Sequence, residues 1–412
     1  MTTVRPLTLD LLRPAWAAEV PSPPHDALSP EQRRQHLLRH PHSYLGVTRA
    51  PEDVDDRSLT VEDLLVAGRR SLETLLEADV FAPSDGPQYF IYRLTANGHT
   101  QTGVVCGVAV SDYENGSVRI HERIRADRAE HLANHLDVVG AQSSPIALAT
   151  RESDRLLDAM DGAIEHDPAL DFVGDDELHQ QVWRVTDPEV AERLGSVLAD
   201  GDLYLIDGHH RAAAAAWHRE RNDHQRRPGD EWMLSAVFPA HQMFNKAFHR
   251  VVDPASAARL QPLIGSEFSG RFVDSVDDVV DRRLSEVAIG FANADSIRWA
   301  VIDLPLPADP SVTNVDRLDM SRLAAGVLRP VLDIDEADPR GRLRYLPGLG
   351  GAPALSALHE ELTPGEAVFV MNPVSMEDLF EVSDHGLVMP PKSTYFEPKV
   401  RSGLFVHFKD RV

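Results

Sequence analysis

Residues 203–217 read Leu-Tyr-Leu-Ile-Asp-Gly-His-His-Arg-Ala-Ala-Ala-Ala-Ala-Trp and form the clearest junction between a strand and a helix in the chain. The apolar start predicts a short buried strand, the glycine predicts a tight turn, and the alanines predict a helix. Such a junction directs helical N–H groups and the positive end of the helix dipole at one point, which suits an anion such as phosphate. Gly208 lets the backbone approach a ligand closely, and Arg211 adds a planar set of donors. We therefore expect an anion site at this turn.

The same residues also allow purely structural interpretations. Asp207 could cap the helix, or it could pair with Arg211 four positions later. His209 and His210 could be structural, or they could be two of three metal ligands. Because several ionisable groups crowd a turn that usually carries Asn, Gly or Ser, we favour a functional site.

Composition narrows the class of protein. The chain has 412 residues, so we expect two or three domains with ample length for buried cores. It has no run of roughly eighteen apolar residues, and its first residues lack the apolar stretch of a signal peptide, so we expect no membrane span and no secretion. Cys106 is the only cysteine, which excludes an internal disulfide and indicates a cytoplasmic protein with this thiol in its core.

The charge pattern bears on partners. The formal net charge is −24 at pH 7, which repels phosphate backbones and anionic lipids, so we expect neither nucleic acid nor a membrane as a partner. Only Lys246, Lys392, Lys399 and Lys409 are lysines among the 41 basic residues. An ammonium is a compact point charge that a guanidinium does not always replace. Three of these lysines lie in the polar segments described below.

Prolines, glycines and apolar periodicity predict three parts: an N-terminal segment at residues 1–85, a core at 86–252 and a C-terminal α/β domain at 253–412. In the first part, a proline-rich loop at 20–27 precedes helices at 30–39, with Ser29 as cap, and at 61–78. In the core we expect strands at 89–94, 103–110, 118–120, 145–150, 181–185, 203–207 and 232–238, and helices at 127–140 and 188–198. A capping box from Asp127 to Glu130 should open the first of these two helices.

Glu122 is a candidate general base. It follows a predicted strand and precedes a helix whose first turns carry Arg128 and His131. A carboxylate at a strand end, beside a cationic helix start, can accept a proton from a substrate. The alternative is a surface glutamate that caps the neighbouring turn.

Two more segments are dense in polar groups. Residues 390–399 read Pro-Pro-Lys-Ser-Thr-Tyr-Phe-Glu-Pro-Lys and place Lys392, Ser393 and Lys399 in a proline-stiffened run, which could bind phosphate or could be a rigid strap. Residues 244–250 read Phe-Asn-Lys-Ala-Phe-His-Arg and bring together Lys246, His249 and Arg250, with the phenylalanines as core anchors.

The usual signatures of nucleotide and hydrolase chemistry do not occur in the sequence. It has no P-loop, no Gly-x-Ser-x-Gly elbow, no His-Glu-x-x-His and no Cys-x-x-Cys pair. Any phosphate chemistry would therefore use the turn at residues 207–211.

Five segments together resemble a known family, the domain-of-unknown-function 1015 family. They are Val-Pro-Ser-Pro-Pro-His-Asp at 20–26, Arg-Ile-His-Glu at 119–122, Asp-Gly-His-His-Arg at 207–211, His-Arg at 249–250 and Met-Pro-Pro-Lys-Ser-Thr-Tyr-Phe-Glu-Pro-Lys at 389–399. Their order is the same as in the family, and the match covers nearly the whole chain. His25 departs from the family, which tends to have tyrosine there.

The segment at 207–211 also resembles the free serine kinases of the ParB/sulfiredoxin-like fold, over a region from about Asp112 to Arg250. This resemblance implies an α+β fold with mixed sheets, flanking helices and a ParB/sulfiredoxin-like core. It implies a nucleotide phosphate at the turn, with roles for Asp207, His209 and Arg211, and an upstream glutamate as base. Glu122 is the best-placed candidate for that base.

The resulting hypothesis is a phosphotransferase that links ATP or ADP to a small hydroxyl compound, with serine as the first choice, and with Mg²⁺ expected from the reaction type. Glu122, Asp207 and His209 would be catalytic, and Asp207 could help to hold Mg²⁺. The nucleotide phosphates would be bound by Gly208, His210, Arg211, Arg128, Lys246, His249, Arg250, Lys392, Ser393 and Lys399. Two alternatives remain: a phosphatase acting on phosphoserine or a similar ester, and a nucleotide-binding sensor without turnover. The sequence does not indicate the oligomeric state.

Overall fold

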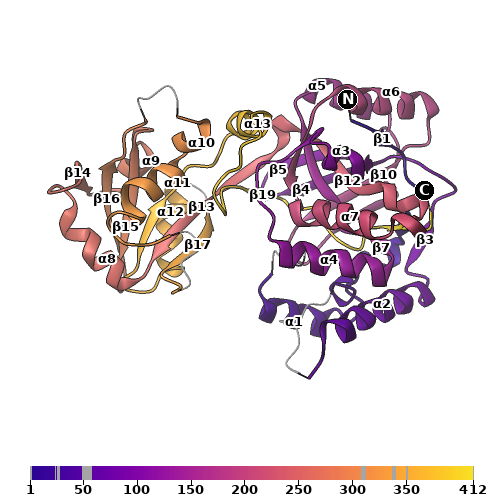
Figure 1. The fold of residues 1–412 in the computed structure, drawn as a ribbon, viewed down its shortest axis with the longest axis horizontal. Coiled ribbons are helices and arrows are strands. Elements are labelled where there is room, and N and C mark those ends of the chain that lie inside the picture. Colours follow the sequence, from indigo (N-terminus) through magenta and orange to yellow (C-terminus); the bar gives the residue numbers. More distant parts are fainter. Residues whose placement is uncertain are drawn as a thin grey trace. The chain divides into compact units, whose positions relative to one another are not determined.

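The computed structural model describes residues 2–23, 25, 28–48, 58–307, 312–335, 340–348 and 351–411. Contacts divide the chain into two units, whose elements are labelled in Figure 1. Unit 1 comprises Met1–Ile120, Ile124–Phe244 and Pro398–Val412, and unit 2 comprises His121–Arg123 and Asn245–Glu397. The chain therefore leaves unit 1 and returns to it twice.

Unit 1 is built on a nine-stranded sheet with the strand order β6-β11-β8-β12-β5-β4-β10-β9, and β1 pairs with β5 outside this path. The pairs β11–β6 and β12–β8 are parallel, while β11–β8, β12–β5, β4–β5, β10–β4 and β10–β9 are antiparallel. Its strands are β1 (Val4–Arg5), β4 (Phe90–Ala96), β5 (His99–Ala109), β6 (Val118–Arg119), β8 (Ile146–Thr150), β9 (Leu170–Val173), β10 (His179–Arg184), β11 (Leu203–Asp207) and β12 (Trp232–Pro239).

A second sheet in unit 1 joins the two ends of the described chain. Its order is β3-β2-β20-β7, formed by β2 (Asp10–Leu12), β3 (Phe81–Pro83), β7 (Ala141–Gln142) and β20 (Phe405–Phe408). Because β20 lies between β2 and β7, the C-terminal segment completes a sheet that the N-terminal segment begins.

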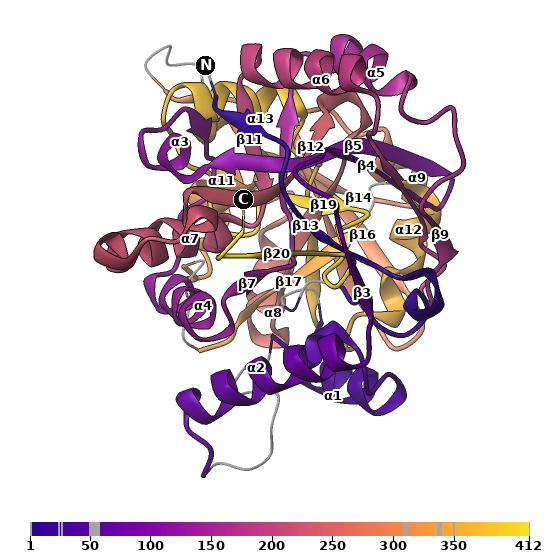
Figure 2. The ribbon, with the colours of Figure 1, turned by 90° about the vertical axis from the view of Figure 1, so that its right-hand side faces the viewer.

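Seven α-helices accompany these sheets in the described part of unit 1: α1 (Pro30–Arg39), α2 (Val61–Glu77), α3 (Val110–Glu114), α4 (Ala126–Val139), α5 (Ser153–Asp161), α6 (Pro188–Asp200) and α7 (His209–Arg221). α5 and α6 lie side by side, as Figure 2 shows, and their Leu156 and Leu194 pack with Ile91 and Val104 of the main sheet. α7 contacts both α4 and the main sheet. All five residues of Ala212–Ala216 are buried, because small side chains let this helix approach its neighbours closely.

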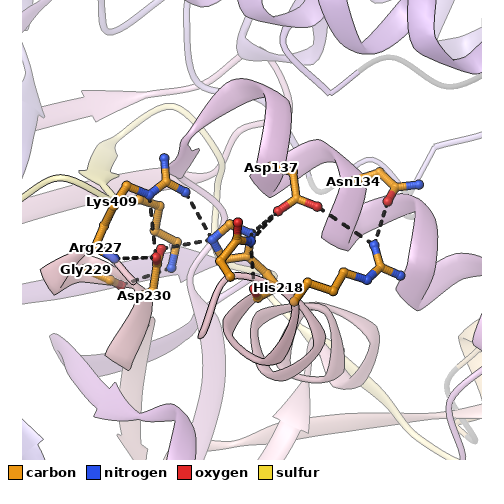
Figure 3. A network of polar contacts seen from close by, with 9 residues as sticks. Asn134, Asp137, His218, Arg227, Gly229, Asp230 and Lys409 are labelled. Atoms are coloured by element: carbon orange, nitrogen blue, oxygen red, sulfur yellow. Dashed lines mark hydrogen bonds and ion pairs between the residues drawn. The ribbon is translucent and has the colours of Figure 1, made fainter. Parts of the chain in front are cut away.

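The C-terminal half of α7 is held by the buried polar network in Figure 3. The fully buried His218 faces Asp137 through Nδ1 (2.6 Å) and Asp230 through Nε2 (2.9 Å). Burial alone would raise the pKa of the Asp230 carboxyl, but its hydrogen bonds with His218 and with the Arg227 backbone N–H lower that pKa to about 2. Lys409, also fully buried, donates from Nζ to the carbonyl oxygen of Gly229 (3.0 Å). Burial lowers the pKa of Lys409 to about 7.

Unit 2 has its own sheet, ordered β14-β16-β15-β18-β13-β17, with β19 paired to β13. The neighbouring pairs along this order are antiparallel. The strands are β13 (Phe244–Val252), β14 (Gly270–Val273), β15 (Glu286–Ala292), β16 (Ile297–Asp303), β17 (Leu343–Gly348), β18 (Ala367–Val370) and β19 (Tyr395–Glu397). The α-helices are α8 (Pro254–Leu260), α9 (Val276–Val280), α10 (Asn314–Arg317), α11 (Asp319–Leu323), α12 (Ala352–Ala357) and α13 (Met376–Asp384).

The predicted α+β class, with mixed sheets and flanking helices, is confirmed. The predicted helix at 30–39 is α1, and Ser29 and Gln32 form its capping box. The capping box predicted for the helix after Glu122 is wrong. α4 begins at Ala126 without a side-chain cap, because Asp127 pairs with the Arg125 side chain instead (2.6 Å).

The contact division has different bounds from the three parts expected from the sequence. Residues 2–85 and 398–411 share unit 1 with most of the expected core, because β2, β3 and β20 pair with one another. The chain enters unit 2 after Phe244 rather than near Asp253, because β13 pairs with β17 and β18. Among the described helices, none is both long and apolar enough to cross a bilayer.

Candidate functional site

The turn at 207–211 joins β11 to α7 within unit 1. Gly208 is the N-cap residue, with φ +101°, a conformation that glycine adopts readily and other residues rarely do. A Cβ atom at Gly208 would lie 2.9 Å from Nε of Arg211, so the missing side chain also makes room for that guanidinium. No side chain caps α7, so the interpretation of Asp207 as a helix cap is wrong.

Asp207 lies between two cations. Its Oδ2 accepts a hydrogen bond from Nη2 of Arg211, and its Oδ1 accepts one from Nζ of Lys399, which is 192 positions later in the sequence. The pairing of Asp207 with Arg211, four positions apart, is thereby confirmed. Nη1 of Arg211 also donates to the carbonyl oxygen of Pro145 (3.0 Å), at the start of β8. The guanidinium is thus fixed between the turn and the neighbouring strand.

The electrostatics of this cluster follow from its composition. Burial alone would raise the pKa of the Asp207 carboxyl, but Lys399 and Arg211 outweigh that effect and hold its pKa well below the usual value. Asp207 is therefore an anion at neutral pH. One carboxylate faces two cations, so the three side chains of Asp207, Arg211 and Lys399 together carry one positive charge at the start of α7.

The two histidines of the turn differ in environment. His209 is 4 % exposed at the first position of α7. Nε2 of His210 accepts a hydrogen bond from the backbone N–H of Arg125 (3.0 Å), which links the start of α7 to the start of α4. Arg128 is an exposed residue of α4. Its role as a phosphate contact stays a prediction.

Lys399 reaches Asp207 because the segment that carries it is anchored on both sides. The carbonyl oxygen of Pro398 accepts a hydrogen bond from Nε2 of Gln101 (2.9 Å). Ser402 forms two backbone hydrogen bonds with Ser22, each 3.0 Å long. The chain just after the last family segment therefore lies beside the first segment in unit 1. Pro24 and Asp26 of the first segment lie outside the described residues, whereas the carbonyl oxygen of His25 accepts a hydrogen bond from Arg33 (2.8 Å).

A second polar cluster lies in unit 2, where β13 meets the segment at 389–397. Nζ of Lys246 pairs with the Glu397 carboxylate. Nη2 of the fully buried Arg250 donates to the carbonyl oxygen of Pro391 (3.4 Å). The ammonium of Lys392 lies over the ring of Phe248, 5.1 Å from its centroid. β13 therefore holds this segment in place through hydrogen bonds, an ion pair and a cation–π contact.

His249 and Ser393 have local partners in this cluster. His249 is fully buried, and its Nδ1 accepts a hydrogen bond from the backbone N–H of Met371 (3.2 Å). Ser393 is also buried, and its hydroxyl donates to the carbonyl oxygen of Pro390 (2.7 Å), which shapes the turn around Lys392. These contacts indicate that His249 and Ser393 support the shape of the cluster.

Glu122 belongs to unit 2, because its neighbours bind the segment at 389–394. The carbonyl oxygen of His121 accepts a hydrogen bond from the backbone N–H of Met389 (2.8 Å), and Nε2 of His121 lies 3.1 Å from the hydroxyl of Thr394. Two family segments that are far apart in the sequence are thus adjacent in unit 2. Glu122 lies directly beside this contact along the chain, and its role as a base stays a prediction.

The predicted site residues fall into two groups. Asp207, Gly208, His209, His210, Arg211, Arg128 and Lys399 lie in unit 1, and Glu122, Lys246, His249, Arg250, Lys392 and Ser393 lie in unit 2. The sequence did not reveal Glu397 as the partner of Lys246 or Thr394 as the partner of His121. The dense polar composition of residues 390–399 was the only signal for these pairs, because neither pair is local in sequence.

A protein-held metal does not fit the Asp207 cluster. Both carboxylate oxygens of Asp207 already face cations, and the described residues contain no group of three His, Cys, Asp or Glu side chains that could hold a metal ion. The sequence also allows His209 and His210 to be two of three metal ligands, but the described residues offer no third ligand beside them. An anion fits better, because the cluster has surplus positive charge at a helix N-terminus.

The fold is that of an α+β protein in which Arg211 and Lys399 share one carboxylate at the start of α7, and the comparisons place the chain in a family. The model of the family "Protein of unknown function (DUF1015)" matches residues 5–321, and the chain belongs to this family. No curated protein matches the chain.

Solved structures with similar folds include three of note. A glutamate-to-alanine mutant of a free serine kinase in complex with ADP has a TM-score of 0.37 and 11 % identity, covering 73 % of this chain and 91 % of that chain. SbnI with a C-terminal truncation from Staphylococcus aureus has a TM-score of 0.36 and 12 % identity, with 73 % and 85 % covered. A conserved hypothetical protein from Pyrococcus furiosus has a TM-score of 0.36 and 14 % identity, with 75 % and 97 % covered.

Proposed function

We propose that this protein is a phosphotransferase that moves a phosphoryl group between a nucleotide, ATP or ADP, and a small hydroxyl compound, with serine as the first choice. One observation carries the proposal: at the start of α7, a single carboxylate, Asp207, is shared by Arg211 and Lys399. The surplus positive charge, the glycine N-cap and the helix dipole favour an anion at this point. Phosphoryl transfer depends mainly on such charge neutralisation and positioning.

In this proposal the residues of unit 1 bind the phosphates. Arg211 and Lys399 contact phosphate oxygens, and Gly208 lets the backbone come close because it has no Cβ atom. His210 and the cation of Arg128 contribute at the edge of the site. Asp207 keeps both cations oriented, and the buried His209 hydrogen-bonds a phosphate oxygen or the substrate.

The residues of unit 2 have two kinds of role in the proposal. Glu122 accepts the proton of the attacking hydroxyl group. Lys392 and Lys246 supply further positive charge. Arg250 is a positioning residue, because it is buried and bonded to the backbone just before Lys392. His249 and Ser393 act in the same way through their local hydrogen bonds.

Mg²⁺ is expected from the reaction type, where it would neutralise charge on the nucleotide phosphates. Since both oxygens of Asp207 already face cations, the described residues of this cluster offer the metal no vacant carboxylate. The proposal therefore has the metal held chiefly by phosphate oxygens. We further propose a cytoplasmic location and no nucleic-acid partner, in keeping with the net charge of −24.

The decisive experiment incubates the full chain with ATP or ADP and L-serine and follows phosphoserine by ³¹P NMR. We expect product with the wild type, and a loss of about a hundredfold or more in Glu122→Ala and Asp207→Asn, since general bases and charge-orienting groups contribute this much. Asp200→Asn, an exposed carboxylate of unit 1, is the matched control. Wild-type turnover in both site variants would overturn the proposal.

Two other outcomes identify the alternatives. Release of phosphate from phosphoserine without any nucleotide would replace the phosphotransferase with a phosphatase. Tight nucleotide binding without turnover of any hydroxyl substrate would indicate a sensor. Either result contradicts the proposed reaction while keeping the anion-binding turn.

A further inference from the structure

A small, partly enclosed cavity of about 70 Å³ lies in unit 1 beside the turn. Its lining combines apolar and polar side chains: Tyr44, Thr48, Leu132, His135, Leu136, Ala141, Gln142, Ser143, Ser144, Ile146, Arg211 and Ala214. Arg211 is the one cation in this lining, and no Asp or Glu is among these residues. The cavity therefore favours an anion over a cation.

Arg211 borders both the cavity and the turn. Its Nη2 bonds Asp207, its Nη1 bonds the Pro145 carbonyl oxygen, and its side chain also lines the cavity. A guanidinium has five N–H donors, and these two bonds use only part of them. Arg211 also shares the Asp207 carboxylate with Lys399, so this one carboxylate does not balance both cations.

His135 supplies a hydrogen-bond acceptor to the same cavity. Its Nε2 lies 3.0 Å from the carbonyl oxygen of Val47, so Nε2 carries the hydrogen and Nδ1 has the lone pair. Burial lowers the pKa of this imidazole to about 4, despite the bond to Val47, so the ring is neutral at pH 7. Since His135 is part of the cavity lining, the unprotonated nitrogen of its neutral ring can accept a hydrogen bond from a ligand hydroxyl group.

Tyr44 adds a hydroxyl group that is removed from bulk solvent. The residue is 1 % exposed and its hydroxyl is fully buried, without a hydrogen bond of standard geometry to the described residues. Its neighbour Ser143 accepts a hydrogen bond from the backbone N–H of Gly403 (2.8 Å), and the Ser143 hydroxyl group can donate to the Tyr44 oxygen. The hydrogen of the Tyr44 hydroxyl group is then available to a ligand that enters the cavity.

From these three groups we infer that the cavity binds a small carboxylate that also carries a hydroxyl group. Arg211 binds the carboxylate, and His135 and Tyr44 bind the hydroxyl group. The cavity holds about five water molecules by volume, which suits a three-carbon hydroxy acid and excludes a nucleotide. The apolar residues around it, such as Leu132 and Ile146, fit the short carbon chain.

This inference is separate from the proposed phosphotransferase activity, because it concerns binding alone. The Arg211 guanidinium nevertheless belongs to both the cavity and the turn at 207–211. A carboxylate drawn to Arg211 from the cavity competes with the phosphate for the same positive charge. Occupancy of the cavity should therefore change the affinity of the turn for a nucleotide, and the reverse change must be of the same size.

The test uses isothermal titration calorimetry on the full chain at pH 7, without nucleotide. The probes are lactate and glycerate, with propionate lacking the hydroxyl group and 1,2-propanediol lacking the carboxylate. We expect saturable binding of the two hydroxy acids, binding of propionate weaker by about fivefold through the loss of a hydrogen bond, and no measurable binding of the diol. Failure of both hydroxy acids to bind, or equal affinity for lactate and propionate, would overturn the inference.

A variant locates the binding. Tyr44→Phe removes one hydroxyl group and should weaken lactate binding by about fivefold. Tyr89→Phe is the matched control, since Tyr89 is equally buried in unit 1 but does not line the cavity, and its affinity should equal that of the wild type. Unchanged affinity in a folded Tyr44→Phe protein contradicts the inference, and if this variant does not fold, the probe series decides. Titration of an ATP analogue into the same protein tests the proposed function separately, since nucleotide binding can fail while lactate binds.

Discussion

Units 1 and 2 each hold one lysine of the segment at 389–399, in contrasting environments. In unit 1, Lys399 bonds Asp207 and is 14 % exposed, with Arg211 on the same carboxylate. In unit 2, Lys392 lies over the face of Phe248 and is exposed to solvent. A carboxylate fixes the position of an ammonium group and cancels much of its charge, whereas an aromatic ring leaves that charge in place.

The contrast suggests different tasks for the two clusters. The unit 1 cluster is prearranged, because three ionic groups hold one another before any ligand binds. The unit 2 cluster fixes the chain around Lys392 through backbone bonds, such as the one from Arg250 to Pro391, and leaves the Lys392 side chain exposed. In the proposed reaction, the prearranged charge would define a phosphate position, and the exposed ammonium would add to the positive charge.

The largest expected effect comes from removing the shared charge in unit 1. Asp207→Asn leaves Arg211 and Lys399 without their common partner, and we expect it to lower the free energy of unfolding by about 3–5 kcal/mol. Glu397→Gln makes the same chemical change in unit 2, where the Lys246 pair is more exposed, and should cost less than about 1 kcal/mol. Urea denaturation of both variants measures the difference. Equal losses would remove the contrast between the clusters.

A third lysine, Lys409, extends the comparison to the pH dependence of stability. Lys409 bonds backbone carbonyl oxygens, and its pKa is lowered to about 7 in the folded state. Between pH 7 and 10 the unfolded chain keeps the Lys409 proton that the folded chain has released, so folding becomes more favourable as pH rises. Relative to Lys409→Met, the wild type should gain about 3 kcal/mol over this range and lose the same amount as pH falls from 10 to 7. A pH-independent difference between the two proteins would contradict the assignment.

A smaller effect is expected from adding a methyl group at the turn. Gly208→Ala places a Cβ atom at φ +101° and against the Arg211 guanidinium, which should cost about 2 kcal/mol. Gly386→Ala in unit 2 also has a positive φ but nothing within 4 Å of the new atom, so it should cost about 1 kcal/mol from the backbone alone. Thermal unfolding compares the two. If both variants lose the same free energy of unfolding, the Arg211 guanidinium moves aside easily and is not fixed over Gly208.

The smallest effect concerns nucleotide affinity. Lys399→Met removes a fixed cation and should weaken ATP binding about tenfold, or about 1.4 kcal/mol. Lys392→Met removes an exposed cation and should weaken binding about threefold. Titrations of both variants at two salt concentrations test this order. A larger loss in Lys392→Met would move the phosphate site to unit 2.

Local structure could be predicted from the sequence because its causes are local. Gly208 marked the start of α7, and Ser29 with Gln32 marked the start of α1. The capping box from Asp127 to Glu130 failed for a reason that is also local, since Arg125 competes for the Asp127 side chain. A sequence pattern indicates which partners a polar side chain could have, but it does not determine which partner the side chain binds in the fold.

The tertiary contacts of the site could not be predicted in the same way. The turn was identified from its residue types, but the pairing of Asp207 with Lys399 spans 192 positions and depends on how the whole chain folds. The pairing of His121 with Thr394 is of the same kind. The family segments indicated which stretches matter, while the structure shows that the predicted site residues within them fall into two groups, one in each unit.

The position of β20 has a consequence for synthesis of the protein. This strand lies between β2 and β7, and the segment that carries it also delivers Lys399 to Asp207. During translation, residues 398–411 leave the ribosome after all of unit 2 has been made. Unit 2 can therefore fold while unit 1 still lacks a central strand and one of its two site cations. The Asp207 cluster of unit 1 is therefore incomplete in a nascent chain until the segment that carries Lys399 and β20 has been made.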